Sequence, residues 1–105
     1  MDIRFEKEYL SDLYFKGTTS DKRHRYQPQI IRKYIRVIDV LRASDSVVDL
    51  LKYHGLNYER LKADKEGLES VRVNDKYRIE FKSEQIEDEI KLTICHIIEL
   101  SNHYK

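Results

Sequence analysis

The chain has 105 residues, which suits one domain core and is too short for two independent cores, so we expect a single domain over residues 1–105. Hydrophobic residues make up 40% and charged residues 37% of the chain, which predicts a small core under a densely ionic surface. The single cysteine excludes an intrachain disulfide and a zinc cluster built from thiolates.

The sequence shows no feature of a secreted or membrane protein. Its first residues, MDIRFEKEYL, are charged and lack the long apolar stretch of a signal peptide. No segment approaches the roughly 18–20 apolar residues needed to span a bilayer. We therefore expect a cytoplasmic protein without a membrane partner.

Charge is unevenly distributed along a chain whose formal net charge is +1. Segment 22–36 holds six basic residues and no acidic one, whereas segment 83–105 holds five acidic and two basic residues. Such a patch indicates local contact with a polyanion, and the alternative is a solvated helix face. The six basic residues are Lys22, Arg23, Arg25, Arg32, Lys33 and Arg36.

The first half of the chain predicts a strand followed by helices. Alternating polar and apolar residues over Asp2–Glu6 predict a half-buried strand, and a short helix is expected over Glu8–Phe15. The strongest pattern is a helix over Pro28–Ala43, because proline suits the first helical turn and apolar residues recur at helical spacing. The expected buried stripe of that helix is Ile30, Tyr34, Val37, Ile38 and Leu41.

After one more short helix, the hydrophobic period changes to that of strands. Ser46 and Asp49 resemble a capping box for a helical turn over Val47–Tyr53. Helices followed by a meander of strands predict an α+β fold, in which two or three helices pack on one face of a small, mostly antiparallel sheet. The expected strands are 58–62, Ser70–Val73, Tyr77–Lys82 and Ile90–Leu100, with a tight turn at 74–76 and an acidic loop at Ser83–Glu89.

Four cations of the strand region are candidates for binding a phosphodiester. Arg60 and Lys62 are two apart on one predicted strand and would share a face, and Arg72 and Arg78 flank the tight turn. Four converging cations would repel each other without an anion, and guanidinium groups match phosphate oxygens in a bidentate way. The alternative is that each cation pairs with a nearby acid. The candidate acids are Glu59, Glu69 and Glu80.

An imidazole and a phenol stand side by side after the last predicted strand, at His103 and Tyr104. These groups can act as acid and base in RNA cleavage, and a frayed chain end is the alternative. Cys95, in the preceding apolar run, is expected to be buried rather than nucleophilic. The sequence lacks a His-Glu-x-x-His spacing and a glycine-rich phosphate loop, so we expect no metal and no cofactor.

The segment Arg60–Phe81 resembles the HigB/RelE toxins of bacterial type II toxin–antitoxin systems. It covers 22 contiguous residues, and it departs from the family pattern at Ala63, where a glycine is usual. The matching motifs are Leu61-Lys62-Ala63-Asp64, Ser70-Val71-Arg72-Val73-Asn74 and Tyr77-Arg78-Ile79.

The resemblance implies an endoribonuclease, or mRNA interferase, that enters the ribosomal A site. In such toxins the ribose 2′-hydroxyl attacks the adjacent phosphate and expels the 5′-oxygen, without a metal. Basic residues on the central strands bind the substrate and stabilise the charged transition state. Carried over by position, Arg72 and Arg78 match the two strand arginines of the family and Lys62 its strand lysine, while Arg60 lies at a nearby, commonly basic position and is assigned to RNA binding.

The terminal motif departs from the family pattern, in which many HigB-type toxins end in aspartate, tyrosine and histidine. Here the order is Asn102-His103-Tyr104. Neighbouring residues of a strand point to opposite faces, so either His103 or Tyr104 is expected to move the proton. Lys62, Arg72 and Arg78 are expected to bind the scissile phosphate.

The resemblance also implies partners. The basic run 22–36 would contact ribosomal RNA through phosphates, without reading bases. A small antitoxin, in many systems a helix-turn-helix protein, would mask the basic face and would alone link the toxin to operator DNA. Two alternatives stay open: a ParE-like toxin that poisons DNA gyrase, and a non-catalytic member that binds only its antitoxin or operator DNA.

Overall fold

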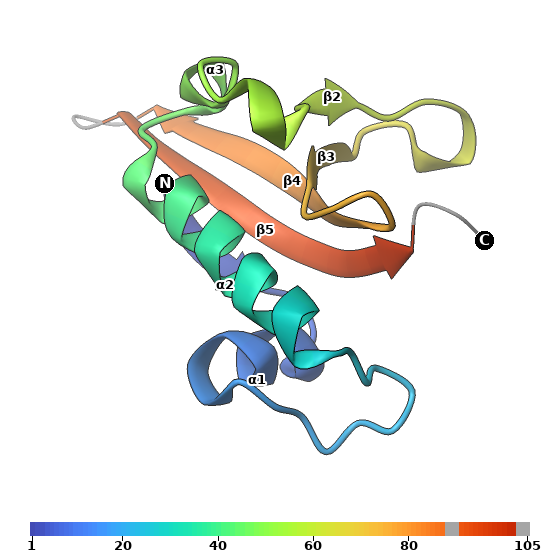
Figure 1. Ribbon diagram of the computed structural model, residues 1–105. Helices are drawn as coiled ribbons and strands as arrows, with labels where there is room; N and C mark the ends of the chain where they lie inside the picture. The colour runs from blue at the N-terminus through green and yellow to red at the C-terminus, as the bar shows by residue number, and fades with distance from the viewer. Residues whose placement is uncertain (88–90, 103–105) are drawn as a thin grey trace.

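The computed structural model describes residues 1–87 and 91–102, so His103 and Tyr104 lie outside the described residues. Helices α1 and α2 lie against one face of a sheet (Figure 1). In chain order the elements are β1 (Asp2–Phe5), α1 (Glu8–Lys16), α2 (Pro28–Ala43), α3 (Val47–Leu50), η1 (His54–Leu56), β2 (Glu59–Arg60), η2 (Ala63–Lys65), β3 (Glu69–Arg72), β4 (Tyr77–Glu87) and β5 (Lys91–Asn102).

Helix α2 has the predicted bounds, with Pro28 in its first turn and the five predicted stripe residues buried. It ends at Ser44, whose hydroxyl donates to the Val40 carbonyl at 2.8 Å. Helix α1 ends at Gly17, whose φ of +72° is the left-handed conformation that glycine adopts without strain. Within the described residues, no helix has the length and apolar character needed to cross a membrane.

The predicted capping box of the short third helix is wrong. The Ser46 side chain makes no cap hydrogen bond. Instead the Asp49 carboxylate accepts a hydrogen bond from the backbone N–H of Asp45 at 3.0 Å, and Asp45 is the residue before the predicted cap residue Ser46. The α-helix is also shorter than expected, because it ends at Leu50 and the chain then turns through 51–53 into η1.

The sheet is five-stranded in the order β1-β5-β4-β3-β2. Strand β1 runs parallel to β5 and every other neighbouring pair is antiparallel, which confirms the predicted α+β class. The tight turn between β3 and β4 is stabilised by Asn74, whose side-chain oxygen accepts the backbone N–H groups of Lys76 and Tyr77.

Two strands differ from their predicted lengths. Strand β4 continues to Glu87, so most of the predicted acidic loop is strand, paired residue by residue with β5. Strand β2 has only two residues, because the chain turns at Ala63 into η2. Ala63 has a φ of +60°, in the left-handed region that glycine adopts without strain.

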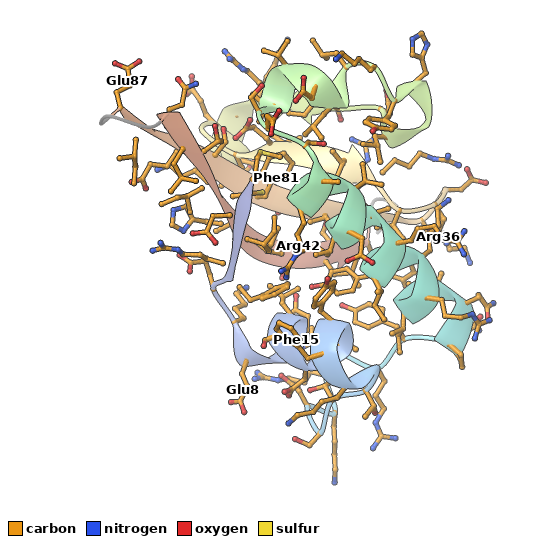
Figure 2. The ribbon with its side chains drawn as sticks, turned by 90° about the vertical axis from the view of Figure 1, so that its left-hand side faces the viewer. Glu8, Phe15, Arg36, Arg42, Phe81 and Glu87 are labelled. Carbon is orange, nitrogen blue, oxygen red and sulfur yellow. The ribbon has the colours of Figure 1, made fainter. Side chains whose placement is uncertain are left out.

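The core lies between the helices and one face of the sheet. Phe81 and Ile79 of β4 and Ile97 of β5 are fully buried there against the α2 stripe, as Figure 2 shows for Phe81. Cys95 belongs to the same cluster, and burial raises the pKa of its thiol to about 12. The expectation of a buried cysteine is therefore confirmed, and a thiol with a raised pKa carries little of the nucleophilic thiolate at neutral pH. Alternate residues of β3 and β4 must point to the opposite face.

Candidate functional site

Two arginines stand opposite each other on the sheet face that points away from α1 and α2. Arg72 of β3 pairs in register with Arg78 of β4, and their neighbours Val71 and Ile79 are buried in the core. Because side chains alternate along a strand, the two guanidinium groups belong to the other face. Like charges directly opposite one another destabilise a sheet, so this arrangement needs anionic partners.

Carboxylates of the chain supply part of that negative charge. Arg78 forms an ion pair with Glu59 of β2, and Arg72 forms one with Asp75 of the turn. The Arg78 side chain is 17% exposed, whereas those of Arg72 and Asp75 are 42% and 86% exposed. The pairing with a nearby acid that the sequence left open is therefore present for Arg78. An exposed ion pair such as Arg72–Asp75 contributes little to the stability of the fold. Arg72 can therefore exchange Asp75 for another anion at a small cost in free energy.

The expected grouping of all four strand-region cations is wrong. Strand β2 ends at Arg60, so Lys62 lies outside the strand, exposed, in the turn before η2. Arg60 follows Glu59, which contacts Arg78, and alternation turns Arg60 the other way. There it lines a hollow with Glu69 and Ser83. The sequence pattern gives neither the end of β2 nor its register against β3, and the register decides which face Arg60 takes.

Lys65 is a cation of this face that sequence reasoning missed. Its Nζ lies 2.5 Å from Oε2 of Glu80, which is two residues from Arg78 on β4 and therefore on the same face. This hydrogen bond raises the pKa of Lys65. The hydroxyl of Ser70, paired in register with Glu80, is fully buried and has no hydrogen-bond partner within residues 1–87 and 91–102. No spacing in the sequence marks Lys65, because η2 alone brings it back over the sheet.

The basic loop between α1 and α2 is anchored to the end of β5. The Tyr26 hydroxyl donates to the Leu100 carbonyl at 3.0 Å, and the Tyr9 hydroxyl accepts the Leu100 N–H at 3.1 Å. Burial raises the pKa of Tyr9 to about 12. The His24 ring stacks on Tyr9 with centroids 3.6 Å apart, and its Nδ1 lies 2.9 Å from Asp21. The loop thus has a defined conformation.

The basic run divides between this loop and α2. Three of its residues lie on the loop and three on α2, and all six are exposed. Lys33 and Arg36 line a hollow together with Arg72, so part of the run lies near one member of the arginine pair. The loop residues are Lys22, Arg23 and Arg25, and the helix residues are Arg32, Lys33 and Arg36.

The predicted proton-transfer residues His103 and Tyr104 lie outside the described residues. The strand that leads to them reaches the site, because Ser101 of β5 pairs in register with Arg78. Across residues 1–87 and 91–102, no group of three or more His, Cys, Asp or Glu side chains is arranged to hold a metal ion.

Comparison with known proteins identifies the family. Residues 3–93 match the HigB-like toxin family, described as the RelE-like toxin of the type II toxin–antitoxin system HigB. The chain belongs to this family. It is 33% identical over 82 residues to Toxin HigB-1 of Vibrio cholerae serotype O1, across 77% of this chain and 82% of that one. A type II toxin has a cognate antitoxin as its partner, so this HigB-like toxin has one too.

A solved structure shows the same fold. The YoeB/ParE toxin from Agrobacterium tumefaciens superposes with a TM-score of 0.56 at 19% identity, covering 99% of this chain and all of that chain. The resemblance to HigB/RelE toxins and the predicted fold are therefore both confirmed.

Proposed function

We propose that this toxin is a ribosome-dependent endoribonuclease that cuts messenger RNA in the A site, in the cytoplasm and without a metal. The observation that carries the proposal is the cross-strand pair of Arg72 and Arg78 on the sheet face away from the helices, with the Glu59 carboxylate beside Arg78. Two guanidinium groups that face each other across neighbouring strands match the oxygens of a phosphodiester, which supports the proposal.

Arg78 is the proposed phosphate clamp. Its guanidinium is largely buried, which strengthens its interaction with an anion and fixes its direction. A scissile phosphate would displace Glu59 and accept the same N–H donors. Arg72 would contribute its charge from the facing strand after releasing the exposed Asp75. Both cations would stabilise the extra negative charge on the phosphorus oxygens in the transition state.

Glu59 is the proposed general base among the described residues. Once the phosphate has taken its place on Arg78, its carboxylate stays at the reacting centre and can accept the proton of the 2′-hydroxyl. Glu80 is a poorer candidate, because its side chain is 7% exposed and bonded to Lys65. The 2′-oxygen then bonds to phosphorus while the 5′-oxygen leaves, taking its proton from His103 or Tyr104. The products are a 2′,3′-cyclic phosphate and a 5′-hydroxyl.

The proposal is tested by adding purified toxin to ribosomes programmed with a defined messenger. Cutting within the A-site codon, with free messenger left intact, is the expected result. A trapped gyrase–DNA complex without loss of messenger would establish the gyrase alternative in its place. Normal growth during expression without antitoxin, together with an intact messenger, would indicate a non-catalytic member.

Replacing Glu59 by glutamine should separate binding from chemistry. The amide keeps the size of the side chain but cannot accept the proton, so we expect kcat on programmed ribosomes to fall about 10²–10³-fold. Because the amide competes less well than a carboxylate for Arg78, messenger affinity should be kept or improved. Glu87→Gln, at the exposed end of β4, is the matched control. Equal kcat for Glu59→Gln and wild type would remove Glu59 from the mechanism.

The basic run on α2 should contribute to ribosome binding through phosphates. Replacing Arg32, Lys33 and Arg36 by glutamine should weaken binding and lower the slope of log Kd against log salt by about one for each phosphate that the variant no longer neutralises. Arg42→Gln is the control on the same helix, because Arg42 stacks over the Tyr14 ring instead. An unchanged slope in the triple variant would show that the run is a solvated helix face and does not contact ribosomal RNA.

A further inference from the structure

A hollow of about 310 Å³ lies between α2, η1 and the end of β3, and the nuclease proposal does not use it. Its lining residues come from α2, from the segment between α3 and β2, and from the end of β3, and Figure 1 shows these parts of the fold. Its floor is aliphatic, with Val37 of α2, Leu56 of η1 and Val73 after β3. The hollow sits where β3 has an unpaired edge, because β2 pairs only with Glu69 and Ser70.

Three cations surround this aliphatic floor. Lys33 and Arg36 line it from α2, and Arg72, the last residue of β3, lines it at the unpaired edge of that strand while its guanidinium pairs with Asp75. Neither Lys33 nor Arg36 forms a salt bridge with an acidic side chain of residues 1–87 or 91–102, and Arg72 has only the exposed Asp75. The hollow therefore offers positive charge around an apolar centre, which matches an acidic segment that also carries aliphatic side chains.

The segment that leads along the chain into the hollow carries exposed apolar side chains. The Tyr53 side chain lines it and is 49% exposed. Val48 and Leu51, three residues apart on the helical turn just before, are 66% and 60% exposed. A nucleic acid held through its phosphates would leave these aliphatic side chains in water, whereas an amphipathic peptide would cover them.

We propose that this hollow and the adjoining turn bind a segment of the cognate antitoxin that carries carboxylates among aliphatic side chains. The carboxylates would pair with Lys33 and Arg36, and the aliphatic side chains would cover Val48 and Leu51. Because Arg72 borders both the hollow and the proposed phosphate site, a bound antitoxin segment would lie beside that site and shield the helix cations from the ribosome. The inference rests on family membership and not on the nuclease activity.

The test titrates purified full-length toxin variants with the purified cognate antitoxin. Two double variants are measured against wild type. One carries Lys33→Glu and Arg36→Glu, and the other carries Val48→Ser and Leu51→Ser. We expect each pair to raise Kd at least tenfold, because each removes one of the two kinds of contact. Phe15→Ser, at an exposed aromatic of α1, should stay within threefold of wild type.

The aliphatic pair distinguishes this inference from the proposed function. Val48→Ser with Leu51→Ser should weaken antitoxin binding while leaving ribosome binding and cleavage unchanged. Antitoxin affinity within threefold of wild type for both pairs would overturn the inference. If the charge-reversed pair then lost ribosome binding alone, the hollow would belong to the ribosomal RNA contact.

Discussion

Arg78→Ala is expected to lower messenger cleavage on programmed ribosomes by about 10³-fold or more. Removing a single preorganised donor from an anionic transition state costs about 10²–10³-fold in kcat, and Arg78 supplies both charge and a bidentate fork. The side chain is largely buried and faces Arg72, so no other cation can take its position without rearranging the strand pair. The loss should appear in kcat more than in ribosome affinity, which the exposed basic run supplies.

Two matched variants make this prediction specific. Arg78→Lys keeps the charge and loses the fork, so we expect an intermediate activity. Arg4→Ala removes an exposed arginine of β1 that pairs with Asp2 and should leave cleavage unchanged. Circular dichroism of each variant checks that the fold persists. Full cleavage by a folded Arg78→Ala protein would remove the arginine pair from the proposed site.

Phe81→Ala should have the largest effect on stability, a loss of about 3–5 kcal/mol in the free energy of unfolding. Phe81 is fully buried, pairs in register with Ile97 and contacts the Tyr58 ring at 6.2 Å between centroids. It therefore joins β4 to the neighbouring strands and to the helices. The whole free energy of unfolding of a domain of this size is about 5–15 kcal/mol, so the variant would be close to unfolding.

Urea denaturation of wild type and variant measures this loss. Phe15→Ala is the control, because its side chain is 67% exposed and its removal leaves no cavity in the core. We expect Phe15→Ala to lower the free energy of unfolding by less than about 1 kcal/mol. A loss below that value for Phe81→Ala would contradict the central position given to this ring.

The sequence predicts the helices and the core well because their signals are local. Helix α2 has proline at its start and one apolar stripe, and both features act within the helix itself. The turn between β3 and β4 is equally local, since Asn74 bonds to the next backbone groups. The family motif lies across this turn, so Arg72 and Arg78 can be paired from the sequence alone.

The remaining features depend on contacts between distant segments. Strand β4 continues through polar residues to Glu87 because β5 pairs with it, and no residue in 83–87 shows that by itself. Strand β2 stops at Arg60 because Ala63 turns the chain in a left-handed conformation, which leaves Lys62 outside the strand and brings Lys65 over Glu80. Alternation alone cannot show where a strand ends.

The most direct test of the account replaces one ribose by deoxyribose in the messenger, at the mapped cut site on programmed ribosomes. Attack by the neighbouring 2′-hydroxyl predicts that cutting at that position disappears, and that the unmodified messenger yields a 2′,3′-cyclic phosphate end. Continued cutting at the deoxyribose would show that another nucleophile attacks the phosphate, and the chemistry assigned to Arg72, Arg78 and Glu59 would be wrong.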